Sequence, residues 1–119
     1  GIINALSELP VGINHEFDNL LLKAGELIWA AGPLKKGHGL CHGTAGNGFA
    51  FLKLFARTRD ESWLDRAKVF AMEAIEQYQN AKALFHQGRY SLWNGDVGLA
   101  IFLDECRRGT ARFPTIDTF

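Results

Sequence analysis

Two short turns bracketed by glycine, each followed by an apolar segment, constrain the fold of this chain most strongly. Gly43-Thr44-Ala45-Gly46 precedes the apolar residues 46–56, and Gly95-Asp96-Val97-Gly98 precedes residues 98–106, 52 positions further on. Gly1-Ile2-Ile3 resembles the end of a third copy. Such a period is typical of repeat architectures, in which each unit buries its apolar face against the next one. The sequence therefore predicts a series of equivalent helix entrances.

Long amphipathic segments lie between these turns. Residues 14–31 and 61–79 carry apolar side chains at helical spacing on one face and polar side chains on the other. Asn14 is a suitable N-cap for the first segment, and Gly32-Pro33 is a suitable end. We expect a loop over residues 80–88. Because almost no stretch alternates with a period of two, we predict an all-α fold. Short buried helices that alternate with long amphipathic ones indicate part of an (α/α) toroid, with an inner and an outer ring.

The charge balance and the cysteines limit the classes of partner and the compartment. Thirteen acidic and thirteen basic residues give a formal net charge of zero, so we expect no binding of nucleic acid. No apolar run approaches the ~20 residues that span a bilayer, and no basic leader is visible. The two cysteines have unlike surroundings and make a poor disulfide framework. We therefore expect a cytoplasmic protein, with peripheral attachment to a membrane as the alternative.

The candidate site is the glycine-rich turn before the first repeat. Cys41 and His42 are neighbours in residues 37–46, which hold four of the thirteen glycines. Zn²⁺ favours thiolate and imidazole ligands, and the start of a helix stabilises a thiolate. A catalytic zinc takes three protein ligands, so a free cysteine beside an unrelated histidine is an equal alternative. His38 lies near the turn and is a candidate substrate contact, with a solvated polar side chain as the alternative.

The remaining candidates have simpler interpretations. Cys106 lies eight residues past Gly98, more than two helical turns from the rim, so we expect a structural thiol. A toroid hydrolase of the glycosidase type would need paired carboxylates at the centre of the ring. Only Asp96 and Asp104-Glu105 lie near the inner helices, and none is at the Cys41-His42 turn. That class of enzyme is therefore disfavoured.

The strings LKKGHGLCHGTAGNGFAFLKL, SLWNGDVGLAIFLDE and ARFP resemble the C-terminal part of the lanthionine synthetase C-like (LanC-like) family, from about Trp29 onward. The resemblance implies an (α/α) barrel of inner-outer helix hairpins around a central zinc. It implies that Cys41 and His42 are two of the three protein ligands, and that the third, a cysteine, lies five residues before Gly1. Lys36 resembles a lysine with which relatives contact glutathione.

The activity that the resemblance implies is the formation of a thioether of the lanthionine type. A zinc-activated thiol, from a peptide cysteine or from glutathione, adds to dehydroalanine or dehydrobutyrine in a peptide. The expected partners are a dehydrated peptide or a small thiol, with a dehydratase as a further candidate. The acid and base of relatives lie in the N-terminal part, so no catalytic residue is assigned in this chain. Residues 81–85 and Asn94 depart from the eukaryotic pattern, which favours a bacterial protein and a peptide thiol over glutathione.

The repeat and the resemblance together predict the extent of the domain. We expect residues 1–119 to be the C-terminal fragment of a single LanC-like barrel, about two and a half hairpins, that is inactive alone. Hairpins that do not close a ring leave apolar lateral faces, through which the fragment is expected to self-associate. The full-length protein is expected to be an enzyme that forms carbon–sulfur bonds. A noncatalytic LanC-like scaffold that binds peptides is the alternative.

Overall fold

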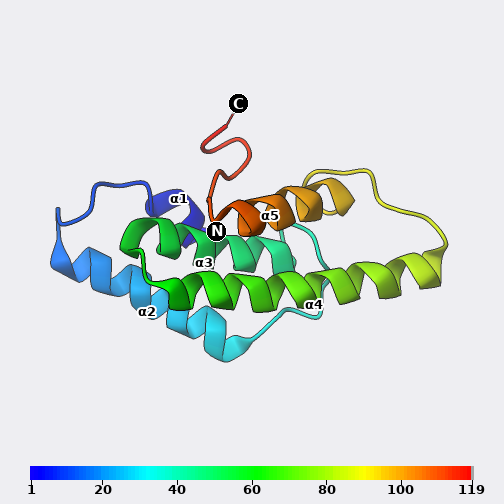
Figure 1. Ribbon diagram of the computed structural model, residues 1–119, viewed down its shortest axis with the longest axis horizontal. Helices are drawn as coiled ribbons and strands as arrows, with labels where there is room; N and C mark the ends of the chain where they lie inside the picture. The colour runs from blue at the N-terminus through cyan, green and yellow to red at the C-terminus, as the bar shows by residue number, and fades with distance from the viewer. Residues whose placement is uncertain (119) are drawn as a thin grey trace.

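The computed structural model describes residues 1–118, and this part of the chain is helical apart from loops and one isolated bridge between Pro114 and Thr118. The helices are α1 (Ile2–Leu6), α2 (His15–Ala31), α3 (Thr44–Thr58), α4 (Glu61–Phe85) and α5 (Asp96–Arg108). The shorter helices α1, α3 and α5 lie in a row with α3 in the middle, and the long helices α2 and α4 cover the row (Figure 1). The all-α prediction is confirmed, and the two layers are those of a segment of a helical toroid.

Helix α3 is the centre of the core and contacts all four other helices. Most of its residues are buried, and Phe49, Phe51, Leu52 and Leu54 are fully so, as expected for a helix enclosed by others. The Phe51 ring lies 4.9 Å, centroid to centroid, from the ring of Phe70 in α4. Helix α4 directs a stripe of buried side chains at this face, from residues at helical spacing: Trp63, Ala67, Phe70, Ala71 and Ala74.

The ends of the helices agree with the sequence-based expectations at α2 and differ at α4. Asn14 caps α2 by accepting a hydrogen bond from the Glu16 N–H (2.8 Å), and Gly32, with φ of 72°, ends it. Helix α4 continues to Phe85, so the loop expected over residues 80–88 is wrong for its first six residues. Residues 80–85 contain neither glycine nor proline. The helix ends where His86 adopts the left-handed conformation and donates its N–H to the Lys82 carbonyl (2.8 Å).

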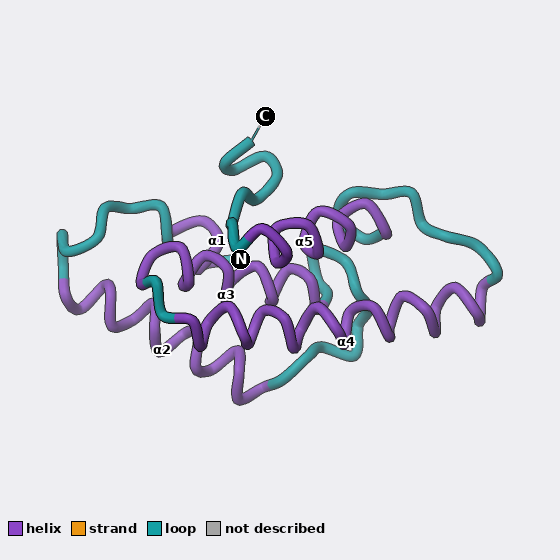
Figure 2. The backbone as a smooth tube through the Cα atoms, in the orientation of Figure 1, coloured by secondary structure: helices purple, strands orange, loops and turns teal. Residues whose placement is uncertain are grey.

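Both ends of the chain are attached to α3 through Lys53. The side chain of Lys53 is only 1% exposed, and its Nζ lies 2.5 Å from Glu8 Oε1 and 2.5 Å from Asp117 Oδ2. One turn further along α3, Arg57 donates hydrogen bonds to the carbonyls of Ser7 (2.8 Å) and Leu9 (2.5 Å). The C-terminal tail, which extends outward from the end of α5 in Figures 1 and 2, is thus joined to α3 by the Lys53–Asp117 ion pair. Arg57 joins the segment after α1 to the same helix.

The described surface carries large apolar side chains that no neighbour covers. Leu20 and Leu27 of α2 and Val69 and Met72 of α4 are all more than half exposed. Self-association through such faces stays a prediction. No helix within residues 1–118 is long and apolar enough to cross a membrane.

Candidate metal and thiol site

Two turns with the same backbone geometry lie at the entrances of α3 and α5. We call residues 37–44 turn 1 and residues 89–96 turn 2. The Thr44 N–H donates to the Gly37 carbonyl (2.9 Å) in turn 1, and the Asp96 N–H donates to the Arg89 carbonyl (2.8 Å) in turn 2. The pattern found in the sequence therefore corresponds to a repeated structure.

Glycine is required in both turns because backbone segments approach closely. A Cβ atom at Gly46 would overlap the Leu40 carbonyl oxygen, and one at Gly98 would overlap the Leu92 carbonyl oxygen. Gly43 and Gly95, the N-caps of α3 and α5, have φ of −119° and −138°, which other residues adopt readily. At these positions too, a Cβ would meet carbonyl oxygens of the same turn, those of Gly37 and Gly39 in turn 1 and of Arg89 and Ser91 in turn 2. Close packing, and not a left-handed conformation, explains these four glycines.

Turn 1 presents Cys41 and His42 side by side, with both residues exposed. They line a cavity of about 220 Å³ together with Lys36, Asn47 and Gly1. Thr44, which follows, is fully buried, and its hydroxyl donates to the Gln77 amide oxygen of α4 (2.8 Å). The two donors thus stand at the edge of a turn that is tied firmly to the core.

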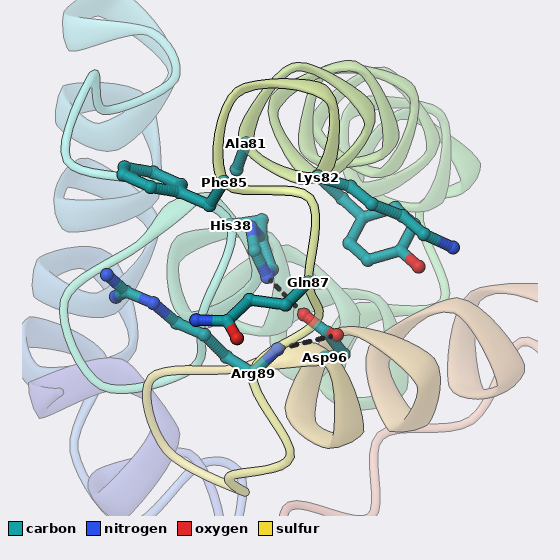
Figure 3. Close-up of a pocket in the computed structure, with 8 residues that line it drawn as sticks. His38, Ala81, Lys82, Phe85, Gln87, Arg89 and Asp96 are labelled. Atoms are coloured by element: carbon teal, nitrogen blue, oxygen red, sulfur yellow. Dashed lines mark hydrogen bonds and ion pairs between the residues drawn. The ribbon is translucent and has the colours of Figure 1, made fainter.

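His38 lies in a different cavity from Cys41 and His42. Figure 3 shows His38 and Asp96 pointing toward each other, and His38 Nε2 lies 3.1 Å from Asp96 Oδ1. His38 is only 6% exposed, and its ring stands edge-on to Tyr78, at 5.6 Å between centroids. The other carboxylate oxygen of Asp96 accepts the Arg89 N–H (2.9 Å). His38 is therefore not a solvated side chain, and it connects turn 1 to turn 2.

The structure brings three of the four predicted site residues together. Lys36, Cys41 and His42 share one cavity, whereas His38 lines the smaller one, of about 100 Å³, with Lys82 and Arg89. Sequence reasoning missed Asp96 as the partner of His38. Its place in the repeat was the available signal, since Asp96 occupies in turn 2 the position of Thr44 in turn 1.

The described residues bring together two candidate metal donors, Cys41 and His42, and not a full set. No group of three or more His, Cys, Asp and Glu side chains that could hold a metal occurs in residues 1–118. The carboxylates near α5 have other partners, since Asp104 pairs with Arg107 (2.9 Å) and Glu105 pairs with Arg112 (3.0 Å). Each of these two carboxylates thus pairs with an arginine of its own.

The two cysteine thiols are expected to differ strongly in reactivity. Cys106 is buried, and this burial raises the pKa of its thiol to about 12. At pH 8 only about one molecule in 10⁴ would carry the reactive thiolate there, whereas Cys41 is exposed. Iodoacetamide at pH 8 should therefore label Cys41 of the folded chain and leave Cys106 unlabelled, as read by peptide mass spectrometry. Urea should make Cys106 reactive, and rapid labelling of Cys106 without urea would contradict the buried position.

Comparison with known proteins places these features in a family. The family model described as lanthionine synthetase C-like protein matches residues 1–118. The chain is 40% identical over 97 residues to glutathione S-transferase LANCL1 of Danio rerio. This alignment covers 81% of this chain and 24% of that protein. It is 36% identical over 105 residues to LanC-like protein GCL1 of Arabidopsis thaliana. This alignment covers 84% of this chain and 24% of that protein.

No solved structure is significantly similar to the chain. The chain spans about a quarter of the length of the two curated relatives. Both relatives are eukaryotic, so they give no support to the bacterial assignment expected from residues 81–85 and Asn94. The match over nearly the whole chain shows that this protein belongs to the lanthionine synthetase C-like family.

Proposed function

We propose that the protein containing this chain is a zinc-dependent LanC-like enzyme that adds a thiol to dehydroalanine or dehydrobutyrine in a peptide. The observation that carries the proposal is the pair of exposed donors, Cys41 and His42, on a turn fixed by close backbone contacts. Both open into a cavity of about 220 Å³ in which a substrate group can reach them. Two free thiols also suit a reducing, cytoplasmic compartment.

The donor chemistry of turn 1 fits zinc. Cys41 and His42 supply one sulfur and one imidazole nitrogen, and a catalytic zinc needs a third protein ligand and an open position for substrate. Gly1 lines the same cavity, so a ligand from a segment next to Gly1 in the full-length protein would complete the set. Zinc bound there would lower the pKa of a coordinated substrate thiol, so that the thiolate would form near neutral pH.

The proposed reaction needs no oxidant or reductant. The sulfur forms a bond to the β-carbon, and the carbon–carbon double bond becomes a single bond. The α-carbon receives a proton, so that S–H is added across the former double bond. No residue described here is assigned as the acid. Lys36 lies in the cavity of Cys41 and is placed to attract a carboxylate of the substrate thiol.

The thiol is proposed to be a peptide cysteine, with glutathione as the second candidate. The relative from Danio rerio is named a glutathione S-transferase, and Lys36 beside Cys41 suits the acidic glutathione molecule. Product analysis by mass spectrometry decides between them. A dehydrated peptide that also contains cysteine is incubated with the full-length protein, with and without glutathione. A cyclic thioether has the mass of the dehydrated peptide, whereas a glutathione adduct is heavier by one glutathione.

Zinc content tests the ligand assignment. We expect Cys41→Ala in the full-length protein to lower the zinc content from about one per chain to near zero, because a catalytic site with one ligand fewer binds weakly. Elemental analysis of the purified protein measures this. Cys106→Ala is the matched control, since it removes the other thiol, and should leave the zinc content unchanged. Unchanged zinc in Cys41→Ala would refute the assignment. Zinc retained by the wild type without any thioether product would favour the noncatalytic peptide-binding scaffold.

A further inference from the structure

Asn47 lines the cavity of about 220 Å³ that also holds Cys41 and His42. It belongs to the first turn of α3, where its backbone N–H donates to the Gly43 carbonyl (3.4 Å). The residue is partly exposed, and its side-chain amide makes no hydrogen bond within the described part of the chain. An amide carries two N–H donors, so both remain available to a ligand in this cavity.

The backbone donors at the start of α3 are already used. The N–H groups of residues 44–46 donate to the carbonyl oxygens of residues 37–39, at 2.9, 3.4 and 3.3 Å in chain order. The first turn of a helix usually leaves such N–H groups free, and they can then bind an anion. Here turn 1 occupies them, so the backbone of the first turn of α3 offers no donor to a substrate oxygen.

Few side chains around the cavity can donate a hydrogen bond in their place. Asn4, the other amide next to this helix entrance, is 2% exposed and donates to the Gly46 carbonyl (3.2 Å). Apart from the two candidate metal donors, the side chains that line the cavity and carry a donor are Asn47 and Lys36. Lys36 is exposed and has a long flexible stem. Asn47 has a short side chain on a helix at the centre of the core, so its donor is held more precisely.

We propose that Asn47 is a catalytic residue whose side-chain N–H donates a hydrogen bond to the carbonyl oxygen of the dehydro residue. This inference rests on the proposed function and adds a residue to it. When the sulfur bonds to the β-carbon, the electron pair of the double bond moves through the α-carbon to the carbonyl oxygen, and an enolate forms. A proton then reaches the α-carbon, and the carbonyl group is restored. Asn47 keeps its own proton throughout.

The reaction requires such a donor because negative charge develops on the carbonyl oxygen as the carbon–sulfur bond forms. A hydrogen-bond donor that is already in place stabilises this charge more than it stabilises the neutral substrate, and therefore lowers the barrier. Asparagine side chains serve as donors of this kind in other enzymes. The amide of Asn47 is neutral, so it can do this without forming an ion pair with the substrate carboxylate proposed for Lys36.

Infrared spectroscopy of a bound peptide tests the hydrogen bond without catalysis. The full-length, zinc-loaded protein is mixed with a peptide that has one dehydrobutyrine, labelled with carbon-13 at its carbonyl, and no cysteine. A hydrogen bond to the oxygen weakens the carbonyl double bond. We therefore expect the labelled carbonyl to absorb at a lower frequency in the wild-type complex than in the complex with Asn47→Ala. Equal frequencies in the two complexes overturn the inference.

Turnover of a dehydrated peptide that contains cysteine measures the effect on the reaction. Asn47→Ala should lower kcat about 100-fold, the usual cost of removing one such donor, with KM nearly unchanged. Zinc content and stability should not fall, because the amide has no partner to lose and alanine favours a helix. Asn80→Ala, which removes an exposed amide of α4, is the matched control and should keep the wild-type kcat.

Two kinetic results would contradict the role of Asn47. One is an unchanged kcat in Asn47→Ala, and the other is a lower kcat that is accompanied by an equal loss of zinc or of folded protein. A wild type that forms no thioether refutes the proposed function, and the catalytic role with it. The infrared comparison distinguishes that result from a failure of Asn47 alone, because it needs neither thiol nor turnover.

Discussion

Replacing Gly46 with alanine is expected to lower the free energy of unfolding by about 3 kcal/mol or more, or to prevent folding. The added Cβ would overlap the carbonyl oxygen of Leu40, which belongs to the backbone and cannot rotate away as a side chain can. Turn 1 must move to admit it, and turn 1 carries Cys41 and His42. We therefore expect zinc to be lost together with stability. Urea denaturation of the full-length protein, followed by circular dichroism, measures the first effect.

Two further glycines serve as comparisons for Gly46. Gly98→Ala should be about as damaging, because its Cβ would overlap the Leu92 carbonyl oxygen in turn 2. Gly109→Ala is the mild control. Gly109 has φ of 67°, and the nearest atom to its Cβ would be 3.6 Å away on Phe55, so only the left-handed backbone opposes the change, at about 1–2 kcal/mol. If Gly46→Ala were no more damaging than Gly109→Ala, the turn would be more adaptable than its contacts indicate.

Lys53→Met is expected to lower the free energy of unfolding by about 3 kcal/mol, the lower end of the cost of breaking a buried ion pair. The methionine keeps most of the apolar stem and removes the charge. Asp117, only 16% exposed, then loses its cationic partner, whereas Glu8 is 58% exposed and can be solvated. We expect the tail to loosen first, since Asp117 also accepts the Phe113 N–H. Hydrogen exchange at residues 110–118 in the variant measures this loosening.

Single carboxylate variants separate the two partners of Lys53. Asp117→Asn should reproduce most of the loss and the faster exchange of the tail. Glu8→Gln should cost at most about 1 kcal/mol, as is typical of an exposed pair. A Lys53→Met variant as stable as the wild type would mean that the desolvation of the ammonium offsets both ion pairs.

Local patterns were sufficient to predict the repeated turns, the buried character of α3 and the position of Cys106 as a structural thiol within α5. Each of these depends on residues close together in the sequence, such as Gly43 and Gly46 before an apolar run. The end of α4 was missed because nothing in residues 80–85 breaks a helix, and the stop comes from the conformation of His86.

The interactions that sequence reasoning missed join distant parts of the chain. His38 binds Asp96, 58 residues away, and Lys53 binds residues near opposite ends of the chain. A lysine in an apolar helix gives no indication of its partners until the fold brings them together.

The contacts that define turns 1 and 2 are made by carbonyl oxygens, N–H groups and glycines, and not by the side chains at the exposed tips. The backbone of each turn therefore keeps its shape with different side chains at the tip. One copy holds a cysteine and a histidine, and the next holds a tryptophan and an asparagine at the same places. A substitution at one of these tips therefore changes the chemistry of the turn while the backbone contacts that shape it stay in place.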